Sequence, residues 1–345
     1  MLKNLLENHK IIFFGGKGGV GKTTVSAACA LARADELSVK NKNAKVLLVS
    51  TDPAHNLGHL FNRDIGAQAT RLTENLFGLE LDPNETVNQH LKEVGSSLRK
   101  LMPTHLSSEV DKHIELSRDA PGMQEAAMLE RIAEIVEQSK DYELVIFDTA
   151  PSGHTSRLMA LPEMMSAWTD GLINRRDKAD KFTDILKNLG NEKKSGSTGL
   201  GDNIFGDNRN LDDEENRTAS DRDGSIRHTL NRRRTRFSNL RDTFADESST
   251  AFVIVLAAER LPVLETIELN NQLQRAGINV AGLVVNKRMP NEVNGFFAER
   301  KKQEEIHLAT LNDALPNLAK QDITLVAQDV VGLEALQEFS EKLFI

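Results

Sequence analysis

The chain has 345 residues, and its 51 acidic and 43 basic side chains give it a formal charge of −8. With 39% hydrophobic and 27% charged residues, it has the composition of a globular protein with a sizeable core, which excludes fibrous and wholly disordered classes. The acidic balance argues against non-specific binding to nucleic acid, so we expect no nucleic-acid partner.

The sequence also predicts the location of the protein and the absence of disulfides and of a structural zinc site. Its apolar runs stop far short of the roughly 18 residues that a membrane-spanning helix needs. The segment Ile11 to Phe14 is too short for a secretory signal, so we expect a cytoplasmic protein. Because Cys29 is the only cysteine, no disulfide can form within the chain, and no structural zinc site of the Cys-x-x-Cys kind is expected.

Short, unbroken apolar runs alternate along the chain with stretches of helical periodicity. The runs are Ile11 to Phe14, Val46 to Val49, Leu144 to Phe147, Phe252 to Leu256 and Ala281 to Val285, with Leu76 to Leu81 as a further candidate. Helices are expected at Lys22 to Glu36, Pro121 to Gln138, Pro262 to Ala276 and Leu333 to Phe344. A strand without polar alternation is buried on both faces, so the pattern predicts an α/β fold with a doubly wound, mostly parallel sheet.

The middle of the chain departs from this alternation. Apolar residues recur there with helical spacing, whereas residues 190–225 are rich in Gly, Asn, Asp and Ser and cannot bury enough apolar surface to fold alone. We predict a helical insertion, residues 158–248 with a mobile loop at 190–225, between two parts of a core, 1–157 and 249–345. Its stripe of Met159, Met164, Met165 and Trp168 either lines a groove for a client helix or packs against the protein's own core.

A glycine-rich segment follows the first predicted strand and opens the first predicted helix. It has the G-x-x-x-x-G-K-T pattern of a P-loop, in which backbone N–H groups and a helix N-terminus cradle phosphate oxygens. We expect Lys22 to reach the β- and γ-phosphates and Thr23 to bind Mg²⁺ through its hydroxyl. The predicted nucleotide-binding residues of this segment are Gly16, Lys17, Gly18, Gly19, Val20, Gly21, Lys22, Thr23 and Thr24.

Two further sequence segments narrow the class of P-loop protein to which the chain is similar. Residues 50–57 read Ser-Thr-Asp-Pro-Ala-His-Asn-Leu, and residues 148–155 read Asp-Thr-Ala-Pro-Ser-Gly-His-Thr. Together with the second lysine of the glycine-rich segment, Lys17, they resemble the deviant P-loop and the two switch segments of the signature-lysine ATPases. The branch that they resemble contains the arsenite-pump ATPase (ArsA) and the targeting factor for tail-anchored membrane proteins. The resemblance spans essentially the whole chain and implies a P-loop NTPase that binds ATP and Mg²⁺ and forms a homodimer around nucleotide.

Two aspartates end strands near the same edge of the predicted sheet, where a carboxylate can hold Mg²⁺ through water. By resemblance, Asp148 has that role, Asp52 orients the attacking water, and Lys17 crosses the dimer interface to the partner's phosphates. An N-cap of a helix is the alternative for Asp52. The resemblance also assigns Pro53, His55, Asn56, Pro151, Gly153 and His154 to the switches.

Contacts to the base rest on the resemblance. Asn286 would contact the adenine edge, Val326 lies in a segment that resembles the adenine loop, and Glu259 would reach the nucleotide of the partner. Each could instead be a turn or cap residue. The proline that the family has near Thr324 is missing here.

The family offers two functions. This chain has neither the paired cysteines that bind As(III) in the pump nor the zinc-binding pair of the targeting factor. His55, His59 and His154 complete no zinc site either. We expect an ArsA-type ATPase of arsenite transport, in which hydrolysis opens and closes the dimer for a membrane-associated process with a membrane pump as partner. The alternative is an ATP-switched targeting factor that carries a hydrophobic client helix.

Overall fold

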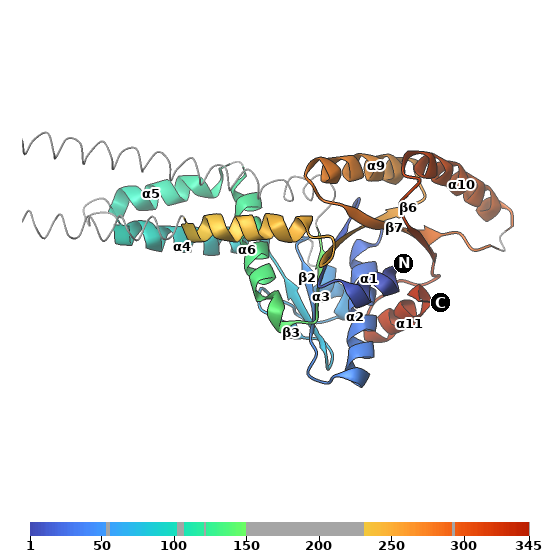
Figure 1. Cartoon of the computed structure of the whole chain (residues 1–345), viewed down its shortest axis with the longest axis horizontal. Coiled ribbons are helices and arrows are strands. Elements are labelled where there is room, and N and C mark those ends of the chain that lie inside the picture. The colour runs from blue at the N-terminus through green and yellow to red at the C-terminus, as the bar shows by residue number, and fades with distance from the viewer. Residues whose placement is uncertain (53–55, 102–106, 121, 150–230, 292–293, 345) are drawn as a thin grey trace, which may run out of the picture.

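The computed structural model of the chain describes residues 1–52, 56–101, 107–120, 122–149, 231–291 and 294–344. Within them, eight strands form one sheet in the order β3-β4-β2-β5-β1-β6-β7-β8 (Figure 1). Neighbouring strands are parallel except β3 and β4, which are antiparallel at one edge. The strands are β1 (Ile11–Gly15), β2 (Val46–Ser50), β3 (Thr70–Arg71), β4 (Leu76–Glu80), β5 (Leu144–Asp148), β6 (Thr250–Ala257), β7 (Val280–Arg288) and β8 (Lys320–Thr324).

The central strands are unbroken apolar runs because both of their faces are covered. All residues of β1, β2, β5 and β6 are buried. Successive side chains of a strand point to opposite faces, so in β1 Ile12 and Phe14 join one core, whereas Ile11 and Phe13 join the other. The six predicted strands and the mostly parallel sheet are thus confirmed.

Helices lie on both faces of the sheet (Figure 1). One face is covered by α1 (Leu2–Asn8), α2 (Lys22–Lys40), α3 (Asn56–Phe61) and α11 (Leu333–Leu343). The other is covered by α6 (Met123–Gln138) with the 3₁₀ turn η2 (Ser139–Asp141), α9 (Arg260–Arg275), α10 (Phe296–Ala314) and the helical residues 231–245. The doubly wound α/β architecture is confirmed. No helix in the described ranges is long and apolar enough to cross a membrane.

Residues 231–245 are a described part of the predicted insertion, and they pack on the sheet. Phe237 and Phe244 are buried, and the ring of Phe244 meets that of Phe13 edge to face with centroids 5.2 Å apart. Residues 158–230, with the methionine stripe and the loop at 190–225, lie outside the described residues. The division into 1–157, 158–248 and 249–345 therefore stays a prediction.

Two helices that the sequence pattern did not indicate extend away from the sheet (Figure 1). They are α4 (Pro83–Leu101) and α5 (Ser107–Arg118). Val87 and Leu91 of α4 are buried in a small cluster with Ala127 of α6. This contact joins the extension to a helix that covers the sheet.

Candidate nucleotide-binding site

The glycine-rich loop connects the end of β1 to the start of α2. Gly16, Gly19 and Gly21 have φ angles of 139°, 82° and 91°, which other residues rarely adopt. A β-carbon on Gly16 would also collide with the carbonyl oxygen of Val255, and one on Gly21 with the side-chain amide nitrogen of Asn286. Glycine therefore allows the loop to bend tightly against β6 and β7 and to end at the N-terminus of α2, a setting suited to phosphate.

Lys22 lies in the first turn of α2 and is buried. Its ammonium donates a hydrogen bond to the carbonyl oxygen of Lys17, 3.1 Å away. Burial lowers the pKa of Lys22, and the negative charges of Asp148 and Asp52 act in the opposite direction. An ammonium group held inside the loop in this way is suited to a phosphate oxygen.

Asp148 ends β5, is fully buried and accepts a hydrogen bond from the Thr23 hydroxyl at 2.6 Å. Burial raises the pKa of the Asp148 carboxyl to about 7, although the Thr23 hydrogen bond and the Lys22 charge lower it. Its second oxygen, Oδ1, has no hydrogen-bond partner among the described residues. A buried carboxylate oxygen without a partner, next to a threonine hydroxyl, fits a hydrated Mg²⁺ ion, which prefers such oxygen ligands.

Asp52 lies two residues beyond the end of β2, and its backbone N–H donates to the Ser50 hydroxyl at 3.3 Å. Ser50 is paired in register with Asp148 across the neighbouring strands β2 and β5. The negative charge of Asp52 acts on the pKa values of both Lys22 and Asp148. The structure therefore brings Lys22, Thr23, Asp148 and Asp52 together at the carboxyl ends of β1, β5 and β2, the usual place for a ligand in such sheets.

Glu80 is a site residue that sequence reasoning missed. It ends β4, is 3% exposed, and accepts hydrogen bonds from the backbone N–H groups of Leu57 and Gly58 at 3.1 and 3.4 Å. These donors belong to the first turn of α3, which otherwise lacks partners for its N–H groups. Glu80 thereby fixes the start of α3, the helix that begins at Asn56 within the predicted switch segment, residues 50–57. The signal in the sequence was an acidic residue at the end of an apolar strand.

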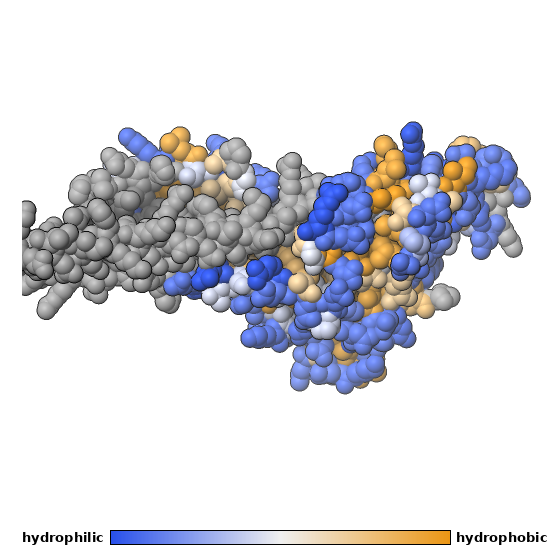
Figure 2. Space-filling view, turned by 45° about the horizontal axis from the view of Figure 1, so that its top comes forward, coloured by the Kyte–Doolittle hydropathy of each residue, from blue (hydrophilic) through white to orange (hydrophobic). Residues whose placement is uncertain are grey.

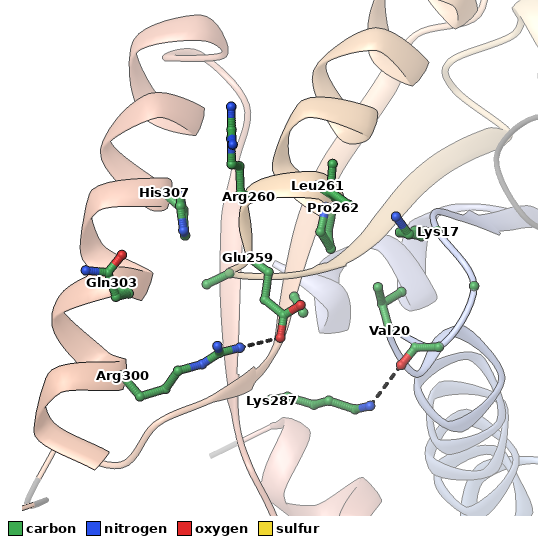
Figure 3. Close-up of a pocket in the computed structure, with 14 residues that line it drawn as sticks. Lys17, Val20, Glu259, Arg260, Leu261, Pro262, Lys287, Arg300, Gln303 and His307 are labelled. Carbon is green, nitrogen blue, oxygen red and sulfur yellow. Dashed lines mark hydrogen bonds and ion pairs between the residues drawn. The ribbon is translucent and has the colours of Figure 1, made fainter. Parts of the chain in front are cut away.

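A cavity of about 450 Å³ opens beside the loop (Figure 3). It is lined by the loop, the turn between β6 and α9, the end of β7, and one side of α10. Glu259 lies in it, paired with Arg300 of α10 (Figure 3). Most of the charged side chains that line the cavity are basic, and they include Lys17, Arg260 and Lys287.

Lys17 is directed towards α9 and not into the loop. Its ammonium pairs with Glu265 of α9 at 2.8 Å, and the two side chains are 32% and 40% exposed. The lysine therefore points to the solvent-accessible side of its own phosphate cradle. Lys17 and Glu259, both predicted to reach a partner's nucleotide, line the same cavity.

The predicted base contacts lie around the end of β7. Asn286 is 5% exposed, and its amide nitrogen donates to the carbonyl oxygen of Val20 at 2.9 Å. Val326 lies in the segment between β8 and α11, which is joined to β7 by a 2.8 Å hydrogen bond from the Leu325 N–H to the Arg288 carbonyl. The hydrogen bond to Val20 supports a role of Asn286 in the shape of the loop, and its contact to adenine stays a prediction.

Several predicted residues lie outside the described ranges, namely Pro53, His55, Pro151, Gly153 and His154. Asn56 is the first residue of α3. Among the described residues, no group of three or more His, Cys, Asp or Glu could hold a metal ion. Cys29 is fully buried in α2, and burial raises the pKa of its thiol far above the usual range.

The glycine-rich loop lies between a strand and a helix that begins with Lys22 and Thr23, and Asp148 lies on the adjacent strand. This arrangement defines the class of P-loop nucleotide hydrolases. The profile of the anion-transporting ATPase family matches residues 9–205 and 208–344. The chain belongs to this family, the ArsA ATPases, and is an ATP hydrolase.

Three relatives cover nearly the whole chain. The "Putative arsenical pump-driving ATPase 2" of Aquifex aeolicus is 32% identical over 96% of this chain and 98% of its own length. The "ATPase get3" of Schizosaccharomyces pombe is 31% identical over 99% and 94%. The "ATPase ASNA1 homolog 1" of Paramecium tetraurelia is 29% identical over 99% and 95%. The resemblance inferred from the sequence motifs is confirmed.

Proposed function

We propose that the protein is a cytoplasmic, homodimeric, Mg²⁺-dependent ATPase whose hydrolysis cycle opens and closes the dimer to drive a membrane-associated transport process. The observation that supports this most is the position of Lys17. Its backbone is part of the loop, but its ammonium is directed away from the loop to Glu265, and the residue lines a cavity that also holds Glu259. A lysine placed there is available to the phosphates of a second copy once it leaves Glu265.

The chemistry follows from the residues that meet at the loop. Phosphoryl transfer needs positioning and neutralisation of charge more than covalent catalysis. Lys22 would bind the β- and γ-phosphates, and Thr23 and Asp148 would hold Mg²⁺, which neutralises phosphate charge when bound. Asp52 would orient the attacking water. Lys17 of the second copy would then stabilise the charge that develops on the γ-phosphate, as an arginine finger does.

Exposed apolar side chains beside the cavity support association with another protein surface. Leu261 and Leu264 of α9 are 61% and 47% exposed, and Phe296 and Phe297 of α10 are 78% and 53% exposed. Figure 2 shows apolar surface among the charged side chains in the region of α9 and α10. A group of apolar side chains on a solvent-exposed face commonly marks an interaction site.

The transported substance is not bound by thiolates. A soft As(III) ion would need several of them, and Cys29 is enclosed in the core, where it cannot meet a second copy. Relatives bear names of both arsenical pump-driving and get3 ATPases. The absence of a thiolate set favours a second candidate, an ATP-switched targeting factor for tail-anchored membrane proteins.

The test measures ATPase rate and mass together. Purified protein is followed by light scattering with and without Mg²⁺ and ATP, and turnover is measured with and without antimonite. We expect Mg²⁺-dependent hydrolysis, a dimer that closes with ATP, and no stimulation by antimonite. A protein that hydrolyses ATP as a monomer would contradict the proposal. Co-purification of a membrane-segment peptide in the ATP state would favour the targeting function.

A further inference from the structure

The end of β7 contains a local irregularity next to the glycine-rich loop. The pairing of β7 with β8 passes from Val285 opposite Asp322 directly to Arg288 opposite Thr324, so residues 286 and 287 form a bulge. Lys287 has a φ of 59°, in the left-handed region that disfavours residues with a β-carbon. Bulges near functional sites commonly redirect side chains.

The bulge directs two successive side chains to two successive carbonyl groups of the loop. The Asn286 amide donates to the Val20 oxygen at 2.9 Å. The Lys287 ammonium donates to the Gly19 oxygen at 2.8 Å (Figure 3). In a trans peptide, the C=O and the N–H of the next residue point in opposite directions. With the carbonyls of Gly19 and Val20 held towards β7, the N–H groups of Val20 and Gly21 are directed to the opposite side.

The strand end that supplies these two donors is itself fixed. Arg288 is 8% exposed and pairs with Glu304 and Glu305 of α10, each at 2.6 Å, and with Asp322 of β8 at 3.1 Å. Arg288 and Glu304 are both buried, so movement of the guanidinium would leave their charges unpaired, which is costly. The bulge therefore has a rigid base on the side away from the loop.

From this geometry we propose that Lys287 is a positioning residue for ATP. Its ammonium holds the Gly19 peptide in the orientation that presents an N–H to phosphate, and so strengthens nucleotide binding without acting on the reacting atoms. The inference rests on the proposed assignment of the loop to the phosphates. It accounts for the presence of a lysine at a backbone angle where glycine would be less strained.

Three substitutions separate this role from a structural one. Lys287→Met removes the donor and keeps much of the side chain, Lys287→Arg keeps a donor, and Lys287→Gly removes the donor while it relieves the backbone. Lys320→Met is the matched control, because the Lys320 ammonium also donates to a backbone carbonyl, that of Leu315 at 3.2 Å, at the start of β8. KM for ATP, kcat, and the midpoint of thermal unfolding are measured for each variant of the full chain.

An interaction that binds ground state and transition state equally changes KM and leaves kcat unaltered. We expect Lys287→Met to raise KM about tenfold with kcat within about twofold, as for the loss of one hydrogen bond to a charged group. Lys287→Arg should retain most of the affinity, and Lys320→Met should have the wild-type KM. Lys287→Gly should raise the unfolding midpoint and yet raise KM.

A wild-type KM in both Lys287→Met and Lys287→Gly would overturn the proposal. So would a fall in kcat at constant KM, because that result would place the ammonium on the reacting phosphate. Failure of the proposed function looks different: the wild-type protein itself would then show no ATP-dependent dimer closure.

Discussion

Replacement of Asp148 by asparagine should stabilise the nucleotide-free protein at neutral pH while it abolishes Mg²⁺-dependent turnover. The Asp148 carboxyl is fully buried, and one of its oxygens has no hydrogen-bond partner among the described residues. Burial makes ionisation unfavourable at this place and outweighs the nearby Lys22 charge, so the pKa of the carboxyl rises to about 7 from an ordinary 3.8. An amide of the same shape has no charge to bury.

The sign of the pH dependence follows from the proton count. Between about pH 4 and pH 7 the folded protein retains the Asp148 proton and the unfolded chain has lost it, so the free energy of unfolding falls as the pH rises. Each pH unit within this window lowers the free energy of unfolding by about 1.4 kcal/mol, so the protein loses about 3 kcal/mol of stability between pH 5 and pH 8. Below the window, and again above it, this group contributes no further change.

Urea unfolding of wild type and Asp148→Asn, with a metal chelator and no nucleotide, measures this effect. The variant should gain about 3 kcal/mol relative to the wild type between pH 5 and pH 8, since other titrating groups are common to both proteins. Mg²⁺ with ATP should stabilise the wild type more than the variant. A difference between the two proteins that stays constant with pH would refute the reasoning about the buried carboxyl.

Two further substitutions test the roles of other residues. Asp52→Asn should retain ATP binding and lose about 100-fold or more of kcat, since it removes the group that positions the water; near wild-type turnover would contradict that role. Glu265→Gln should release Lys17 and lower the ATP concentration for half-maximal dimer closure by up to about fivefold, the range for a half-exposed ion pair. Glu268→Gln is the control, because Glu268 lies on the same helix and its described hydrogen bond is to Gln272 one turn away. Equal behaviour of the two variants would show that Glu265 does not restrain Lys17.

The sheet could be predicted from the sequence because its central strands are buried on both faces. A short, unbroken apolar run between helical stretches is typical of such a strand, and β1, β2, β5 and β6 all contain one. The edge strand β8 has only Ile323 buried, and α10 buries only Glu304, Leu308 and Leu311. Elements that bury so few side chains leave little periodicity to detect.

The same reasoning accounts for the parts of the site that were found. The motifs that contain Lys22, Thr23, Asp148 and Asp52 each come at or just after the end of a predicted parallel strand, so these residues could be placed at one edge of the sheet. Glu80 and Lys287 contribute through contacts between segments that are distant in sequence, and a bulge such as that at 286–287 leaves no pattern in the residues themselves. The partner of Lys17 on α9 was likewise not visible from the motif.

Mixing two inactive variants tests most directly whether Lys17 acts on the nucleotide of a second copy. Lys17→Ala lacks the lysine but keeps Asp52, and Asp52→Asn supplies the lysine but lacks the aspartate. In a mixed dimer, one site has both groups only if the lysine crosses the interface. The two variants are mixed in equal amounts and left to exchange subunits under native conditions. The mixture should then have about a quarter of the wild-type rate, because half of the dimers are mixed and each mixed dimer has one complete site out of two. A mixture as inactive as its two components would contradict the account.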